Sequence, residues 1–148
     1  MRLFRRQETH PAPELDAARR DELLLFQRQA NIKFKDLDLL NLAFCHRSFA
    51  NEQDSSVGNN ERLEFFGDSV LGMVVAEYLY DSLPDRAEGD LAKIKSFVVS
   101  EASLSAIAKD LRVDNFILIG KGEEYSGGRT KKALLADAME AIIGAYFM

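Results

Sequence analysis

The sequence predicts one all-α domain. The chain has 148 residues, of which 47% are hydrophobic and 29% are charged, an ordinary composition for a single globular domain. Most apolar residues recur at the three- and four-residue spacings of amphipathic helices, and only the run 116–119 resembles a strand. Because that run is solitary, it is equally compatible with a short buried helix or a turn.

Composition also excludes several classes of protein. A single cysteine, Cys45, cannot form an internal disulfide, and with two histidines it cannot complete a Cys/His zinc site. No apolar run approaches the roughly 18 residues of a membrane-spanning helix. We therefore expect a cytoplasmic protein without a membrane partner. The net charge of -5 argues against attraction to nucleic acid by the average surface, although not by a local face.

The first part of the chain predicts a flexible arm and two helices. The basic N-terminus is followed by prolines and polar residues instead of an apolar core, so it is no secretory signal. We expect a loose arm over 1–13, a helix over 14–30, a second helix from Asp36 to about Ser48, and a solvated loop over 51–60.

Three further helices and a closing helix follow. The predicted segments are a helix over 61–80 capped by Asn59 or Asn60, a helix over 89–98, a Ser100-capped helix to about 111, a Gly- and charge-rich loop over 120–132, and a helix over 133–147. The domain would thus span 14–148.

The helix over 61–80 has an unusual polar face. At 100° per residue, one stripe opposite the apolar core stripe carries Glu61, Glu64 and Asp68. An acidic stripe is usually just a solvated face. This one also carries Phe65, Val75 and the small Gly72, so we expect the helix to be covered on both sides.

Two further carboxylates lie in an apolar segment. Asp137 and Glu140 are three residues apart, which places their Cβ atoms about 5 to 6 Å apart on one helix face. Burying adjacent carboxylates is costly unless a cation neutralises them. A divalent metal ion is one candidate, and an ion pair with an arginine such as Arg62 is the alternative.

The ligand chemistry narrows the choice of metal. Carboxylates without thiolate or imidazole suit Mg²⁺, with Mn²⁺ as a substitute, and such sites commonly serve phosphoryl transfer. A carboxylate-bridged redox site would need Glu-x-x-His pairs, which the positions of His10 and His46 do not provide. We expect His46 and Cys45 to be packed residues.

Weaker signals lie outside these two helices. Glu88 can be an ordinary helix start or a supporting acid. Several cations could contact a phosphate backbone or simply form a solvated charge run: Lys93, Lys95, Arg129, Lys131 and Lys132.

Together, these motifs resemble the endonuclease domain of ribonuclease III. The run 61–71, Glu-Arg-Leu-Glu-Phe-Phe-Gly-Asp-Ser-Val-Leu, matches that family's signature nearly residue for residue, with Phe66 where leucine is commoner. Further motifs follow in the family's order, so that the resemblance covers about 20–148: the segments 42–52, 88–90, 120–129 and 135–141.

The resemblance implies an all-α homodimer that cleaves double-stranded RNA with Mg²⁺ during RNA processing and uses no organic cofactor. Cleavage by activated water would leave 5′-phosphate and 3′-hydroxyl ends with short 3′ overhangs. By position, the metal ligands would be Glu64, Asp68, Asp137 and Glu140, of which Asp68 and Glu140 are also catalytic. Glu61 and Glu88 would be supporting acids, and Phe65 would insert into the partner subunit.

The chain also departs from the family pattern. Bacterial members usually continue into a double-stranded-RNA-binding domain, which we expect to be absent from this chain. Its RNA affinity would then be weak and salt-dependent, and would rest on the five cations named above. The alternative function is a catalytically silent, dimeric RNA-binding scaffold, although such a module has no reason to retain mutually repelling acids.

Overall fold

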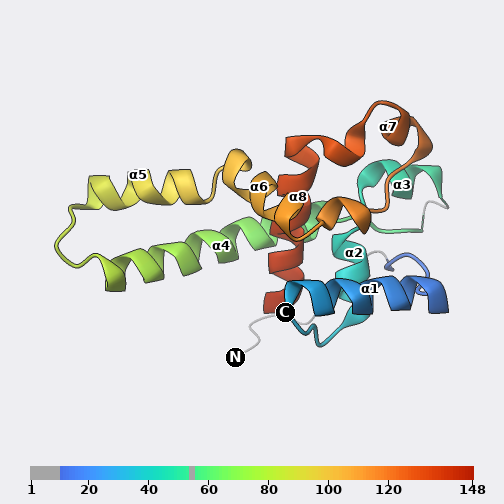
Figure 1. Cartoon of the computed structure of the whole chain (residues 1–148), viewed down its shortest axis with the longest axis horizontal. Helices are drawn as coiled ribbons and strands as arrows, with labels where there is room; N and C mark the ends of the chain where they lie inside the picture. Colours follow the sequence, from blue (N-terminus) through green and yellow to red (C-terminus); the bar gives the residue numbers. More distant parts are fainter. Residues whose placement is uncertain (1–10, 54–55) are drawn as a thin grey trace.

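The computed structural model describes residues 11–53 and 56–148 of the chain. In this part of the chain the structure is helical, as predicted (Figure 1). Its α-helices are α1 (Ala17–Ala30), α2 (Leu37–Ala43), α3 (Arg47–Glu52), α4 (Glu61–Ser82), α5 (Glu88–Val98), α6 (Glu101–Asp110), α7 (Lys121–Tyr125) and α8 (Lys132–Phe147). Two 3₁₀ turns, η1 (Val113–Asn115) and η2 (Gly128–Thr130), complete the elements.

Side-chain caps explain where several helices begin. The side chains of Asp16, Asp36 and Ser100 each accept a hydrogen bond from the backbone N–H three residues later. At the start of α4, only one of the two candidate caps bonds to the helix terminus. Asn59 accepts from the Glu61 N–H at 3.0 Å, whereas the buried Asn60 donates from its side-chain amide to the backbone carbonyl of Ala43, the last residue of α2.

The predicted second helix is wrong in its extent, because the segment 36–52 forms two helices. The backbone around Cys45 pairs with Leu118 in an isolated parallel bridge instead of continuing the helix. Leu118 donates to the Phe44 carbonyl at 2.9 Å and accepts from the His46 N–H at 3.0 Å. The strand-like run 116–119 therefore supplies the partner that interrupts α2, and α3 extends into the predicted loop as far as Glu52.

The predicted loop over 120–132 contains more structure than composition indicated. It holds α7 and η2, and Arg129 joins them to the body. The Arg129 guanidinium donates to the carbonyl oxygens of Asp114 and Ile117 at 2.7 and 2.8 Å, and to both carboxylate oxygens of Glu124. An arginine that crosslinks three segments holds this nominal loop in one conformation.

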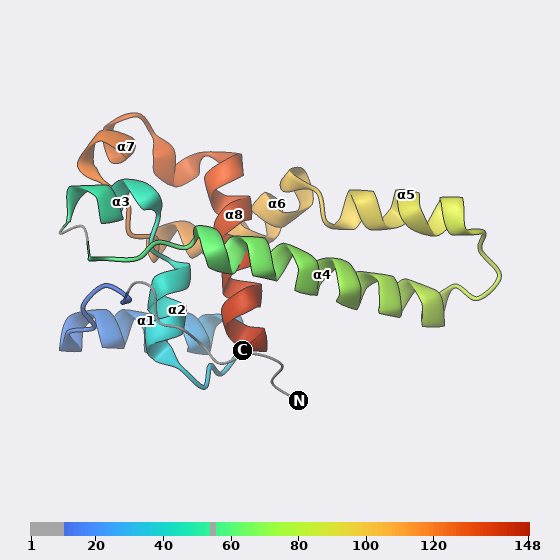
Figure 2. The same ribbon diagram turned by 180° about the vertical axis from the view of Figure 1, so that it is seen from behind.

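The core of the body surrounds α8, which crosses α4. Helix α8 lies in front of α4 in Figure 1 and behind it in Figure 2. Helices α2, α4 and α6 all pack on α8. This explains why its sequence is apolar on nearly every face. Beside it, α1 contributes Phe26, whose ring packs edge-on against Phe44 and Phe116 with centroids 5.0 and 5.4 Å away.

The second half of α4 projects from the body together with α5, which runs back alongside it (Figure 2). We call this α4–α5 hairpin the arm. No residue of α5 is buried. Large apolar side chains are exposed along α4 and α5: Phe65, Met73, Val74, Tyr78, Tyr80, Phe97 and Val98. The expectation that α4 is covered on both sides is therefore wrong for the single chain.

Two smaller findings complete the fold. The N-terminal segment 1–13, which we expected to be loose, lies mostly outside the described residues, but its last part is attached to the body. Pro11 accepts a hydrogen bond from the Gly58 N–H, and Pro13, which is buried, accepts one from the Asn41 side chain. Among the described helices, none has the length and apolar character needed to cross a membrane.

Candidate active site

The site forms where α4 and α8 cross, and two glycines make the crossing possible. A Cβ atom on Gly67 would overlap the backbone carbonyl oxygen of Glu140, and one on Gly144 would lie 2.6 Å from that of Leu63. The helices therefore touch backbone to backbone. Glu64, three residues before Gly67 on α4, is thereby brought close to the acids of α8.

Three carboxylates converge at this crossing. Oxygen atoms of Glu64, Asp137 and Glu140 all lie within 4.8 Å of one another, and all three side chains are half-buried. We call these residues the acidic cluster. They come from segments more than 70 positions apart in sequence, so tertiary packing assembles a group that neither helix contains by itself.

The cluster strongly disfavours its own negative charge. Burial, followed by repulsion from Asp68, Glu64 and Asp137, raises the pKa of Glu140 to about 7. Burial and neighbouring acids, foremost Asp137, raise the pKa of Glu64 as well. The pKa of Asp137 is also raised, again mainly by burial and then by Glu101. Such a group gains stability from a bound cation.

The acids that act on Glu140 argue against the alternative of an ion pair. The charges that shift its pKa all come from carboxylates, and among the described residues no ion pair joins an arginine to Glu140 or Asp137. The pairing of Asp137 or Glu140 with an arginine such as Arg62, open on sequence grounds, is not supported. The donor set instead consists of carboxylate oxygens, the ligands of hard divalent cations, and the cluster could hold such an ion.

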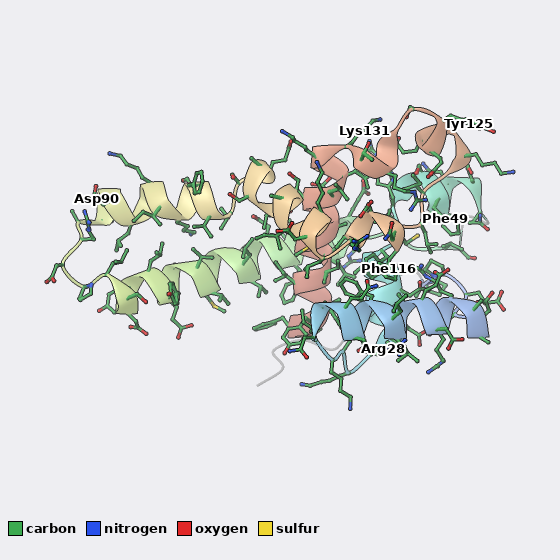
Figure 3. The ribbon with its side chains drawn as sticks, viewed as in Figure 1. Arg28, Phe49, Asp90, Phe116, Tyr125 and Lys131 are labelled. Carbon is green, nitrogen blue, oxygen red and sulfur yellow. The ribbon has the colours of Figure 1, made fainter. Side chains whose placement is uncertain are left out.

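The remaining predicted acids are placed at different distances from the cluster. Asp68 is exposed and lies outside the group of mutually close oxygens, although its charge acts on both Glu64 and Glu140. Glu61, one turn before Glu64, lies at the rim and acts on it too. Glu88 begins α5, whose first turn is at the tip of the arm, where Asp90 is labelled (Figure 3), so the single chain does not bring it to the cluster.

The predicted basic residues differ in how available they are. Arg129 is committed to the crosslink described above, and Lys131 donates to Glu123 at 2.7 Å. Lys93 is exposed on α5. Lys132, the first residue of α8, is also exposed, whereas the Lys95 side chain lies near Gly72, 3.6 Å from where a Cβ atom would be. The contact at Gly72 is thus an ordinary one, unlike the close backbone approaches at Gly67 and Gly144.

The structure also places Arg47 and His46 near the cluster, and sequence reasoning assigned a site role to neither. Arg47 forms an ion pair with Glu61, with Nη1 and Oε1 3.6 Å apart. The positive charge of Arg47 acts on Asp137, and that of a protonated His46 would do the same. The usable signal was their position directly after the apolar run 37–45, within a motif of the family resemblance.

His46 serves the local structure, as expected of a packed residue. Its Nδ1 accepts from the Ser48 N–H and lies 2.7 Å from the Ser48 hydroxyl, which accepts from the Gly120 N–H at 2.9 Å. Burial lowers the pKa of His46. With Glu52, which accepts from the Lys121 N–H, this network attaches α3 to the start of α7.

Comparison with known proteins gives one consistent result. A family model described as Ribonuclease-III-like matches residues 36–148. A ribonuclease 3 of Treponema denticola is 61% identical over 134 residues, which are 90% of this chain and 54% of that protein. A ribonuclease 3 of Treponema pallidum is 51% identical over 148 residues, or 99% of this chain and 57% of that protein. The chain thus spans about half the length of these curated relatives.

Solved structures agree with the sequence relatives. The nuclease domain of ribonuclease III from Campylobacter jejuni superposes with a TM-score of 0.74 at 46% identity, over 81% of this chain and 80% of that one. A second structure of that domain, at 2.2 Å resolution, gives a TM-score of 0.73 over 81% and 78%. The helical fold, the ordered motifs and the acidic cluster agree with these matches, and the chain belongs to the ribonuclease-III-like family.

Proposed function

We propose that this chain is a nuclease domain that hydrolyses double-stranded RNA with Mg²⁺, or with Mn²⁺ as a substitute. The observation that carries the proposal is the convergence of Glu64, Asp137 and Glu140 within 4.8 Å at the α4–α8 crossing. Relatives named ribonuclease 3 and a solved ribonuclease III nuclease domain support it. The products would carry 5′-phosphate and 3′-hydroxyl ends with short 3′ overhangs.

The residues divide into metal-holding and supporting roles. Glu64, Asp137 and Glu140 would hold the ion, with Asp68 as a further ligand close enough to act electrostatically on Glu140. A bound divalent ion would supply activation of water and stabilisation of negative charge on the phosphate. Asp68 and Glu140 are the residues we assign to the reaction itself. Glu61, at the rim, would support the arrangement.

The acidic cluster also explains why an ion is needed before RNA can react. The converging carboxylates present negative charge to a polyanion, so without a cation the acidic cluster repels the phosphate group that is to react. The cations that we propose as RNA contacts are Lys93, Lys95 and Lys132, with Arg129 and Lys131 in a supporting role because their side chains already hold acceptors within the chain.

We further propose that the chain acts as a homodimer through the arm and the adjoining first turns of α4. Phe65 is 79% exposed on the acidic side of α4, and Phe97 is 76% exposed on α5. Such exposed apolar surface is typical of an interface. One Campylobacter jejuni structure is described as showing structural flexibility in the region of the nuclease domain that is involved in dimer formation. In a dimer, Phe65 would insert into the partner subunit, and Glu88 would be placed by the association of two arms.

We test the hydrolysis directly. The chain is incubated at low salt with a long, perfect RNA duplex and either Mg²⁺ or EDTA, and the product ends are mapped. Metal-dependent fragments with the expected ends support the proposal. Glu140→Gln should reduce cleavage by at least about a thousandfold while the protein still binds the duplex, because the site loses a charged ligand. Glu14→Gln, an exposed residue before α1, is the matched control and should cleave normally.

Other outcomes would favour a different function. If the duplex stays intact with Mg²⁺ yet shifts in a native gel, the chain is a silent RNA-binding scaffold and the proposed hydrolysis is wrong. Binding of Mn²⁺, followed by electron paramagnetic resonance, provides a readout independent of activity. Loss of that binding in Glu140→Gln, but not in Glu14→Gln, would locate the ion at the acidic cluster.

We also propose a role in RNA processing in the cytoplasm, which accords with the single, buried and unpaired Cys45.

A further inference from the structure

Arg47 is held at the rim of the acidic cluster by backbone contacts of the segment just before it. The bridge between Cys45 and Leu118 fixes the segment just before α3. The Asn60 N–H donates to the Cys45 carbonyl at 2.8 Å, which ties this segment to the residue that precedes α4. The first residue of α3, Arg47, is consequently placed beside the first turn of α4, where Glu61 lies.

The contact between Arg47 and Glu61 is loose. Their nearest nitrogen and oxygen atoms are 3.6 Å apart, and the two side chains are 66% and 54% exposed. Charge-assisted hydrogen bonds of arginine are normally about 2.7 to 2.9 Å long. An exposed pair at the longer distance contributes little to stability. Folding energetics therefore do not account for the position of this guanidinium.

Two other arginines of the chain show what a structural arginine looks like. Arg19 is buried and donates to Asn41, to Glu22 and to the Phe116 carbonyl at 2.7 to 2.8 Å. Arg129 has a similarly complete set of acceptors. Among the described residues, Arg47 has one partner at 3.6 Å, which leaves most of its donors available to an external acceptor.

The electrostatic position of Arg47 shows how near it is to the cluster. Its positive charge acts to lower the pKa values of Glu64 and Asp137, against the net upward shift of both. It is thus a permanent cation at the edge of an acidic site. The fork of an exposed arginine matches the oxygens of a phosphate group.

We propose that Arg47 binds a backbone phosphate of the RNA strand next to the acidic cluster and thereby positions that strand for cleavage. The inference rests on the proposed function, because it needs a duplex at this site. Arg47 would exchange its weak contact with Glu61 for a phosphate contact, and Glu61 would then be available to other groups at the rim.

Binding of a duplex by a cleavage-deficient protein tests this role. In the Glu140→Gln background, which prevents cleavage and removes one acidic charge from the cluster, affinity for a short RNA duplex is measured over a series of salt concentrations. Adding Arg47→Gln should weaken binding about tenfold and reduce the slope of log affinity against log salt by about one, as for one lost phosphate contact. Arg47→Lys should restore part of the affinity. Arg28→Gln, an exposed arginine on α1 (Figure 3), is the matched control and should change neither quantity.

A double-mutant comparison separates a phosphate contact from an effect through Glu61. If Arg47 contacts RNA, Arg47→Gln weakens binding equally whether Glu61 is present or replaced by Gln. If the effect disappears in the Glu61→Gln background, Arg47 acts only by holding Glu61, and the inference is overturned. An unchanged affinity and salt slope in Arg47→Gln overturns it as well.

The outcomes also distinguish this inference from the proposed function. Metal-dependent cleavage by the unmodified chain, combined with no effect of Arg47→Gln on binding, removes the Arg47 contact alone. Failure of the unmodified chain to bind or cleave the duplex refutes both proposals. Thermal melting of Arg47→Gln should match that of the unmodified chain, because the side chain is exposed and its only ion pair in the described structure is weak.

Discussion

At the scale of single residues, the candidate site depends on carboxylates whose negative charge is unfavourable in their half-buried positions. Glu140 is half-buried among other acids, and its pKa is raised to about 7. Cys45 shows the opposite case of a reactive group made inert. It is completely buried, and burial raises the pKa of its thiol to about 12, so the thiolate is unavailable at neutral pH. Of these two kinds of group, only the carboxylates are therefore available for chemistry at neutral pH.

The raised pKa of Glu140 predicts a pH-dependent stability without metal. Folded Glu140 takes up a proton at about pH 7, whereas in the unfolded chain it does so near the ordinary value of 4.5. Its protonation favours the folded state, so this contribution is present at low pH and is lost as pH rises from about 4.5 to above 7. At pH 8, Glu140→Gln should be more stable than the unmodified chain by about 1 kcal/mol, allowing for solvent screening.

Urea unfolding in EDTA at pH 8 and pH 5 measures this difference. The advantage of Glu140→Gln should shrink at pH 5, because the native carboxyl is then already neutral. Comparing the variant with the unmodified chain at each pH cancels the titration of other groups such as His46. An advantage that stays constant with pH would contradict the predicted linkage.

At the scale of elements, the crossing of α4 and α8 determines the geometry of the site. Gly67 and Gly144 let the two backbones touch, and both lie within four residues of a cluster acid. The helix caps and the bridge at Cys45 then set where α4 begins and how α3 is directed. Small residues at one crossing thus control the distance between carboxylates on two helices.

Gly67→Ala should damage both the fold and the site. Its methyl group would overlap the Glu140 carbonyl, so the helices must separate, and we expect a loss of about 3 kcal/mol or more in unfolding free energy. Gly72→Ala is the matched control on the same helix, with only the Lys95 side chain nearby at 3.6 Å. It should be neutral or up to about 1 kcal/mol more stable, through helix propensity. Equal effects of both substitutions in urea titrations would contradict this view of the crossing.

At the scale of the whole molecule, the arm is the feature whose apolar side chains a single chain leaves exposed. The body has a well-packed core around α8, whereas α5 has no buried residue and α4 exposes apolar side chains beyond the crossing. Because removing apolar surface from water is favourable, such side chains favour association with another apolar surface. Dimerisation would also be the step that completes the arrangement of Glu88 and Phe65.

Phe65→Ala should weaken the dimer by at least about tenfold in dissociation constant, because a large exposed aromatic side chain is a typical anchor of an interface. Sedimentation equilibrium measures the change. Tyr125→Ala removes an aromatic side chain that is 91% exposed on α7, away from the arm, and should leave the association constant unaltered. A mass that is monomeric for the unmodified chain, or unaffected by Phe65→Ala, would contradict the proposed role.

Much of this protein follows from local pattern in the sequence. Helical periodicity predicted the all-α fold, and cap residues such as Ser100 marked where helices begin, because these signals depend on neighbours within one or two turns. The acids were predicted individually for the same reason, since a carboxylate such as Asp137 in an apolar helix is conspicuous in sequence. The family followed from the order of the motifs.

Only the tertiary structure decided which residues meet. The break between α2 and α3 depends on pairing with Leu118, more than 70 residues away, which no local pattern contains. Likewise, Arg129 is an RNA candidate by charge but a crosslink by contact, whereas Arg47 lies at the site. The sequence by itself determined the helices and the chemistry they carry. Long-range packing decided the distances between those groups, because burial and electrostatic repulsion act through space and not along the chain.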